Sequence, residues 1–179
     1  KEDAEKKFAH LIKDNEFRII SSSGCSISRT NDVLITNADK IAYPCRLLFV
    51  GDNLAEDIET VEKIIKNKGI QNIEILGKVD QNELKYLIDN SHIGIVNYHQ
   101  KDTNNRLCAS GKIYEFLFEG IPVVTTTNPP LKKLCEDHSI GASDDNYYGA
   151  INKVLKNYEE YKANVAAFIK SNSARDNDE

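Results

Sequence analysis

Short apolar segments alternate with amphipathic segments along almost the whole chain, and this alternation limits the possible folds more than any other feature. Six apolar segments indicate strands, over residues 17–20, 46–50, 72–76, 92–98, 121–125 and 139–142. Most are apolar on consecutive positions, which is typical of parallel strands buried on both faces. We therefore predict an α/β fold: a Rossmann-like, doubly wound parallel sheet of about six strands with helices on both faces.

The segments between the strands show apolar residues at helical spacing. They predict helices over 1–15, 54–68, 81–90, 111–119 and 131–137, and one or two more within 144–169. Gly69 is a natural stop for the second helix. Residues 30–42 are ambiguous but carry a helical stripe, and the polar segment 171–179 is expected to be disordered. We assign residues 1–172 to one domain and 173–179 to a polar tail.

Composition and charge narrow the class of function. A net charge of −5 and a pI near 5.5 argue against nucleic acid or an anionic membrane as the main partner. No apolar run approaches the roughly 20 residues of a membrane span, and no signal peptide opens the chain. The four cysteines lack metal-site spacing, so we expect buried, reduced thiols in a cytoplasmic protein. The chain has no methionine and begins at Lys1, so we expect it to be part of a longer protein.

Ligands of doubly wound sheets bind beyond the carboxyl ends of the strands. The loops expected at that edge are 21–28, 51–53, 77–79, 97–111 and 125–130. The loop 97–111 is the longest and leads into a predicted helix. Ser110 is a plausible cap for this helix, and Gly111 lets the backbone approach a ligand closely.

A lysine and a glutamate follow on the first turns of that helix. Backbone N–H groups at a helix start, together with Lys112, suit a diphosphate. Glu115 lies one turn deeper on the same face, where its carboxylate can accept two hydrogen bonds from a vicinal diol, as on a ribose. The alternative is a solvated Lys–Glu pair worth a few tenths of a kcal/mol. The position after a long polar loop at a strand end favours the binding interpretation.

The segment SGKIYEFLFEGIPVVTTTNPP, followed by SIG and an acidic DD, resembles the carboxyl-terminal half of GT-B glycosyltransferases of the group 1 type. The upstream segment NIEILGKVDQNELKYLIDNSHIGIVNY is similar to the same family. The resemblance covers roughly residues 17–158, and it is the order and spacing of the motifs that make it specific.

The resemblance implies one half of a two-domain enzyme. In this family the carboxyl-terminal domain binds a nucleotide-sugar donor, and the amino-terminal domain holds the acceptor. An acceptor-binding domain is then expected upstream of residue 1, with a saccharide or lipid-linked acceptor and peripheral contact with the inner face of the membrane. The implied reaction is sugar transfer to an acceptor hydroxyl, as in bacterial surface polysaccharide synthesis. No metal and no cofactor are expected, and the isolated half is expected to be inactive.

Site residues carry over from the resemblance by position. Glu115 matches the glutamate that binds the ribose. The diphosphate is expected to contact Gly24, Arg29, Arg106, Ser110, Gly111 and Lys112. The nucleobase is expected to meet the loop of Gly77, Lys78 and Val79. Asn97 and His99 are weaker candidates for a donor contact, and the resemblance assigns no catalytic residue.

Two positions depart from the family pattern. Leu107 stands where many members have a second glutamate that contacts the transferred sugar. Members often carry an Arg and a Lys five apart after the first strand; Arg29 stands for the first, but Leu34 is found at the second, and Arg106 is a possible substitute. Leu107 favours one alternative, a non-catalytic nucleotide-binding domain. A second alternative keeps the fold and changes the reaction: a GT-B-like sugar-nucleotide epimerase, for which we would expect more acids and histidines in the cleft than this chain has.

Overall fold

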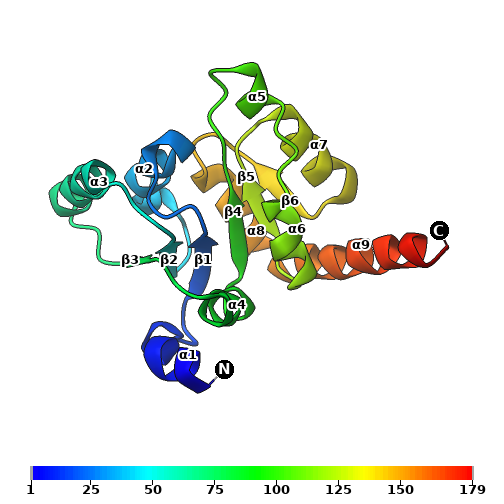
Figure 1. The fold of residues 1–179 in the computed structure, drawn as a ribbon, viewed down its shortest axis with the longest axis horizontal. Helices are drawn as coiled ribbons and strands as arrows, with labels where there is room; N and C mark the ends of the chain where they lie inside the picture. The colour runs from blue at the N-terminus through cyan, green and yellow to red at the C-terminus, as the bar shows by residue number, and fades with distance from the viewer. Residues whose placement is uncertain (1, 179) are drawn as a thin grey trace.

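The computed structural model of the chain describes residues 2–178 and shows a six-stranded, fully parallel sheet (Figure 1). Its strands are β1 (Phe17–Ser21), β2 (Cys45–Val50), β3 (Ile73–Gly77), β4 (Ile93–Val96), β5 (Val123–Thr125) and β6 (Gly141–Ser143). The strand order is β3-β2-β1-β4-β5-β6, the order of a doubly wound sheet. The predicted fold class is confirmed.

Helices connect the strands and cover both faces of the sheet (Figure 1). They are α1 (Glu2–Phe8), α2 (Asn31–Thr36), α3 (Ala55–Lys68), α4 (Gln81–Asp89), α5 (Thr103–Arg106), α6 (Lys112–Phe118), α7 (Pro129–His138), α8 (Tyr148–Lys156) and α9 (Tyr158–Asp178). Short 3-10 turns occur at Ala9–Leu11 (η1), Ile27–Arg29 (η2) and Ala38–Lys40 (η3). Gly69 adopts a left-handed φ of 64° and ends α3 as predicted.

Consecutive strand residues point to opposite faces, which explains their continuous apolar character. Ile20, Leu48 and Val96 pack with α1, α4, α6 and α7 in one core cluster. Ile19, Leu47 and the other strand residues that point to the opposite face pack with α2, α3 and α8 in a second cluster. A helix layer on each face therefore buries every central strand on both sides.

Helix α6 is held against the sheet by a close contact with a glycine. A Cβ built on Gly94 of β4 would lie 2.3 Å from the ring of Phe116, which is fully buried. Only a glycine leaves room for this ring, so the contact fixes how closely α6 approaches β4. The start of α6 is thereby placed near the carboxyl end of the sheet.

The helix boundaries differ from the prediction in several places. The helix predicted over 1–15 ends at Phe8 and is followed by the 3-10 turn η1. The loop after β4 contains α5, a single turn capped by the carboxylate of Asp102, which accepts from Asn105 N. Helix α7 begins at Pro129 because a proline in the first turn leaves no needed N–H unpaired. The expected disorder of 171–179 is wrong for the described residues, because α9 continues to Asp178. No Gly or Pro interrupts the sequence from Tyr158 to that point. Glu179 lies outside the described residues.

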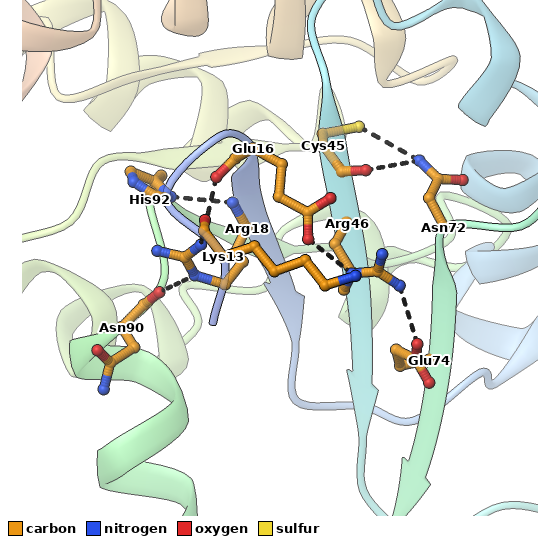
Figure 2. Close-up of polar contacts among 9 residues, drawn as sticks. All are labelled: Lys13, Glu16, Arg18, Cys45, Arg46, Asn72, Glu74, Asn90 and His92. Carbon is orange, nitrogen blue, oxygen red and sulfur yellow. Dashed lines mark hydrogen bonds and ion pairs between the residues drawn. The ribbon is translucent and has the colours of Figure 1, made fainter. Parts of the chain in front are cut away.

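A polar cluster ties together the amino ends of the strands (Figure 2). The guanidinium of Arg18, a buried residue, donates to the backbone carbonyls of Asn90, Lys13 and Glu16. Its own backbone N–H donates to Nδ1 of His92 over 2.9 Å. Burial, aided by the positive charge of Arg18, lowers the pKa of His92 to about 4. His92 is therefore a neutral structural residue. It lies at the amino ends of the strands, whereas the candidate site lies at their carboxyl ends.

Candidate functional site

The topology places a switch point between β1 and β4, where the strand order reverses direction. These two strands are paired in parallel, with Ser21 opposite Ile95 near their carboxyl ends. The connections that follow them lead to α2 and toward α6, and so diverge on either side of the sheet. The predicted residues of loops 21–28 and 97–111 therefore flank the place where doubly wound sheets bind ligands.

Two cationic side chains, those of Arg29 and Lys112, lie within electrostatic range of each other at this edge. The guanidinium carbon of Arg29 lies 4.0 Å from the ring centroid of Tyr98, and Nη1 donates to the backbone oxygen of Asn97 over 3.4 Å. Lys112 at the start of α6 is half-buried. Burial is the main cause that lowers the pKa of Lys112, the positive charge of Arg29 lowers it further, and Glu115 acts in the opposite direction. The three charged groups predicted from the sequence therefore lie within electrostatic range of one another.

Neither cation is paired with a carboxylate in the part of the chain whose side chains the structure describes. Among residues 2–175, no carboxylate lies within 4.0 Å of the charged nitrogens of Arg29 or Lys112. Glu115 is exposed on the same helix turn without such a pair. Two neighbouring cations without a carboxylate partner form an environment that favours an anionic ligand.

Ser110 organises the start of α6, as the sequence suggested. Its Oγ accepts a hydrogen bond from Lys112 N at 3.2 Å and another from the hydroxyl of Tyr98 at 2.8 Å. Gly111 follows with a φ of −66°, and a Cβ built there would meet no atom within 4 Å. The backbone at Gly111 is therefore open to a ligand because no other atom lies close to it. Its backbone conformation is an ordinary helical one.

The turn after β1 needs its glycine. Gly24 has a φ of 60°, and a Cβ added there would lie 2.4 Å from Oδ1 of Asn53. That same oxygen accepts from Cys25 N at 2.8 Å. The loops after β1 and β2 are thus joined, and Gly51 N extends the connection to the carbonyl of Gly77 at 2.8 Å.

The predicted base-binding loop lies at the end of β3, an edge strand of the sheet. Gly77 adopts a φ of 68°, Lys78 is exposed and Val79 is half-buried against one core cluster. The loop stands beside the turn of Gly51, on the β2 side of the switch point. Its role in base recognition stays a prediction.

A buried hydrogen-bond network lies beneath the cations, and sequence reasoning missed it. The amide of Asn97 donates to Oδ1 of Asn31 at 2.9 Å and to the hydroxyl of Tyr147 at 3.0 Å. That hydroxyl also contacts Thr30, next to Arg29. Burial raises the pKa of Tyr147 to about 12, and the residue adopts a positive φ of 66°. The network fixes the turn that carries Arg29.

The suggested ligand contact of the Asn97 side chain is wrong, because this side chain is 2% exposed and bonded within the network. Nδ1 of His99 accepts a local hydrogen bond from Lys101 N. Nothing in the sequence marked Tyr147 as more than a packing residue. Tyr98 could have been found as the aromatic residue that ends the apolar segment at the switch point.

The family departures have distinct structural outcomes. Leu34 is 1% exposed in a core cluster, so its position faces the interior. Leu107 is 50% exposed beside α5, and its apolar side chain is open to solvent or a ligand. Arg106 is exposed at the end of α5, and no side-chain hydrogen bond or ion pair ties it to residues 2–175. Its contact with a diphosphate stays a prediction.

The described residues contain no group of three or more His, Cys, Asp or Glu side chains arranged to hold a metal ion. Across the same part of the chain, no helix has the length and apolar character needed to cross a membrane.

Solved structures with the same fold include nucleotide-bound proteins. HepE of Anabaena in complex with UDP and glucose superposes with a TM-score of 0.73 at 17% identity, covering 92% of this chain and 45% of that one. Sucrose-phosphate synthase of Thermosynechococcus elongatus gives 0.68 at 16% identity, with 93% and 44% covered. UDP-GlcNAc 2-epimerase of Neisseria meningitidis bound to UDP-GlcNAc gives 0.65 at 16% identity, with 92% and 42% covered. The chain thus spans about half the length of these proteins.

A search of curated proteins found no match. The family model for glycosyl transferases group 1 matches residues 2–172, which include both core clusters and the switch-point loops. The chain therefore belongs to the group 1 glycosyl transferase family.

Proposed function

We propose that this chain is the donor-binding domain of a glycosyltransferase that uses a nucleoside-diphosphate sugar. The proposal rests mainly on one observation: Arg29 and Lys112 lie within electrostatic range of each other near the switch point, and Glu115 follows one turn further along α6. Among residues 2–175, no carboxylate forms an ion pair with either cation. The two cations suit a diphosphate, and the glutamate suits the ribose hydroxyls. HepE is found in complex with UDP and the epimerase is bound to UDP-GlcNAc, which supports a uridine nucleotide as the first candidate.

The chemistry of this half is electrostatic. When the bond between sugar and diphosphate breaks, negative charge develops on the departing phosphate oxygens. Arg29, Lys112 and the open backbone at Gly111 would stabilise that charge. Because the loops of Gly24 and Asn53 and the network under Arg29 are already formed, little reorganisation would accompany the reaction.

The acceptor would be held by a second, amino-terminal domain, which we also propose. The chain's coverage of about half of each similar structure supports this arrangement. A saccharide or lipid-linked acceptor, a role in surface polysaccharide synthesis and a peripheral membrane contact would then belong to the whole protein. Free thiols at all four cysteines, each within the described residues, support a reducing, cytoplasmic location.

The test is a thermal unfolding series with millimolar UDP, GDP, ADP and dTDP. A ligand present at about 100 times its dissociation constant stabilises a fold by roughly 2.7 kcal/mol. We expect one nucleotide to raise the midpoint for wild type and to lose its effect in Glu115→Ala. Glu119→Ala is the matched control, because Glu119 lies just past the same helix and pairs instead with Lys85. If Glu115→Ala and Glu119→Ala respond like wild type, the assigned ribose contact is wrong.

Activity of the complete protein separates the alternatives. A transferase releases the nucleoside diphosphate and forms a new glycosidic bond. An epimerase returns a nucleotide sugar with altered stereochemistry, and a non-catalytic domain yields neither product. We expect glycosidic product.

A further inference from the structure

The Tyr98 side chain contacts Arg29 directly and is linked to the backbone of Lys112 through Ser110. Its ring lies under the guanidinium of Arg29, with 4.0 Å between the guanidinium carbon and the ring centroid. Its hydroxyl donates to Oγ of Ser110 at 2.8 Å, and the same Oγ accepts from Lys112 N at 3.2 Å. A continuous chain of contacts thus runs from Arg29 to Lys112 through one tyrosine.

The tyrosine itself is held firmly. It is 8% exposed, and its backbone N–H donates to the hydroxyl of Thr126 at 3.0 Å. The preceding residue, Asn97, is bonded through its side chain to the buried network. Both the backbone and the side chain of Tyr98 are therefore fixed before any ligand arrives.

Two like charges held near each other repel, so a flexible pair would separate when no anion is bound. The face of the Tyr98 ring attracts the Arg29 guanidinium, and the backbone of Lys112 is fixed through Ser110. The tyrosine thus opposes that separation. The two cations are already ordered in the folded protein, so ligand binding does not carry the entropic cost of ordering them.

We propose that Tyr98 is a positioning residue that holds Arg29 and Lys112 in one geometry for the diphosphate of the ligand. The inference rests on the proposed function, since it assumes that this pair binds a nucleoside diphosphate. Tyr98 acts through the two cations and makes no contact with the reacting atoms. It was absent from the residues that the sequence pattern assigned to the site.

The experiment compares UDP with uridine, because only UDP carries the phosphates. Tyr98→Phe keeps the ring under Arg29 and removes the link to Ser110, so we expect about 5-fold weaker UDP binding, the effect of one buried hydrogen bond. Tyr98→Leu removes both contacts, and we expect about 20-fold weaker binding. Uridine binding should be unchanged in both variants.

Two further variants sharpen the test. Tyr161→Phe is the matched control, because Tyr161 has the same 8% exposure but lies on α9 in the other core cluster. It should bind UDP like wild type. Ser110→Ala removes the contact to Tyr98 and also the one to Lys112 N, so it should weaken UDP binding at least as much as Tyr98→Phe does. The double variant should be no weaker than Ser110→Ala alone, since that change already removes the contact that Tyr98→Phe removes.

The outcomes separate the two claims. Wild type that does not bind UDP or any other nucleoside diphosphate overturns the proposed function, and this inference with it. Wild type that binds UDP while Tyr98→Phe and Tyr98→Leu bind it equally well overturns the inference alone. A parallel loss of uridine and UDP binding also overturns it, because that pattern reports general damage to the fold.

Discussion

Replacing Lys112 with methionine should separate ligand binding from stability. The Lys112 ammonium is half-buried, and its pKa is lowered by burial and by Arg29. The folded state therefore releases this proton more readily than the unfolded state, so at pH 7 the charge opposes folding. Methionine keeps the length of the side chain and has a similar helix propensity. We expect Lys112→Met to leave the free energy of unfolding unchanged or to raise it by less than about 1 kcal/mol.

The same change should impair binding. Hydrogen bonds to a charged group contribute about 1.5–3 kcal/mol, which corresponds to about 10- to 150-fold weaker nucleoside diphosphate binding. Urea unfolding without ligand and calorimetric titration with UDP measure the two quantities on the same sample. A loss of stability above about 1 kcal/mol would show that Lys112 has a structural partner, and unchanged affinity would remove it from the site.

Three other predictions concern the frame around the site. The free energy of unfolding should fall by about 2 kcal/mol, after allowance for solvent contact, as the pH drops from about 7 to about 4. The reason is that His92 is neutral in the folded state and gains a proton on unfolding. The urea midpoint should therefore depend less steeply on pH in His92→Gln than in wild type. Gly94→Ala should lower the free energy of unfolding by about 1–3 kcal/mol, because the added Cβ would meet the ring of Phe116. Gly111→Ala should leave stability near wild type, because a Cβ there meets no atom. Equal urea midpoints for the two variants would contradict the packing argument. Tyr147→Phe should lose about 2 kcal/mol, because its hydroxyl serves a buried network, and a change below about 0.5 kcal/mol would mean that water replaces it.

The layers of the fold were predictable from the sequence because strand burial leaves a local signal. Residues such as Ile19 and Ile20 face opposite cores, so the sequence there is apolar without alternation, and this pattern identifies a covered parallel sheet. Gly69 marked a helix end correctly through its own backbone freedom. In each case the information lies within a few residues of the element it determines.

The elements that were missed depend on contacts between distant segments or on very short motifs. Helix α5 is a single turn defined by the cap of Asp102, which is too short for a periodic pattern. Tyr147 lies 117 positions from Thr30, its hydrogen-bond partner, so no local pattern announces their contact. Helix α9 continues through a polar segment whose composition alone indicated disorder.

The candidate site was predictable in part for the same reason. Lys112 and Glu115 share one helix turn, so their spacing is visible in the sequence. Arg29 is far from them in the sequence. It comes near them because β1 pairs in parallel with β4, which places the segments after both strands at the same edge of the sheet. The support by Tyr98 joins three separate segments and required the structure.

The most direct test of the donor-site assignment is to map the contact surface of UDP by NMR. At 20.2 kDa the chain is suited to amide chemical-shift titration. We predict that saturating UDP shifts the amides of residues 24–29, 77–79 and 110–115 most strongly, at the carboxyl edge of the sheet. Shifts centred on the opposite edge around Arg18 and His92, or none at saturating UDP, would contradict the account.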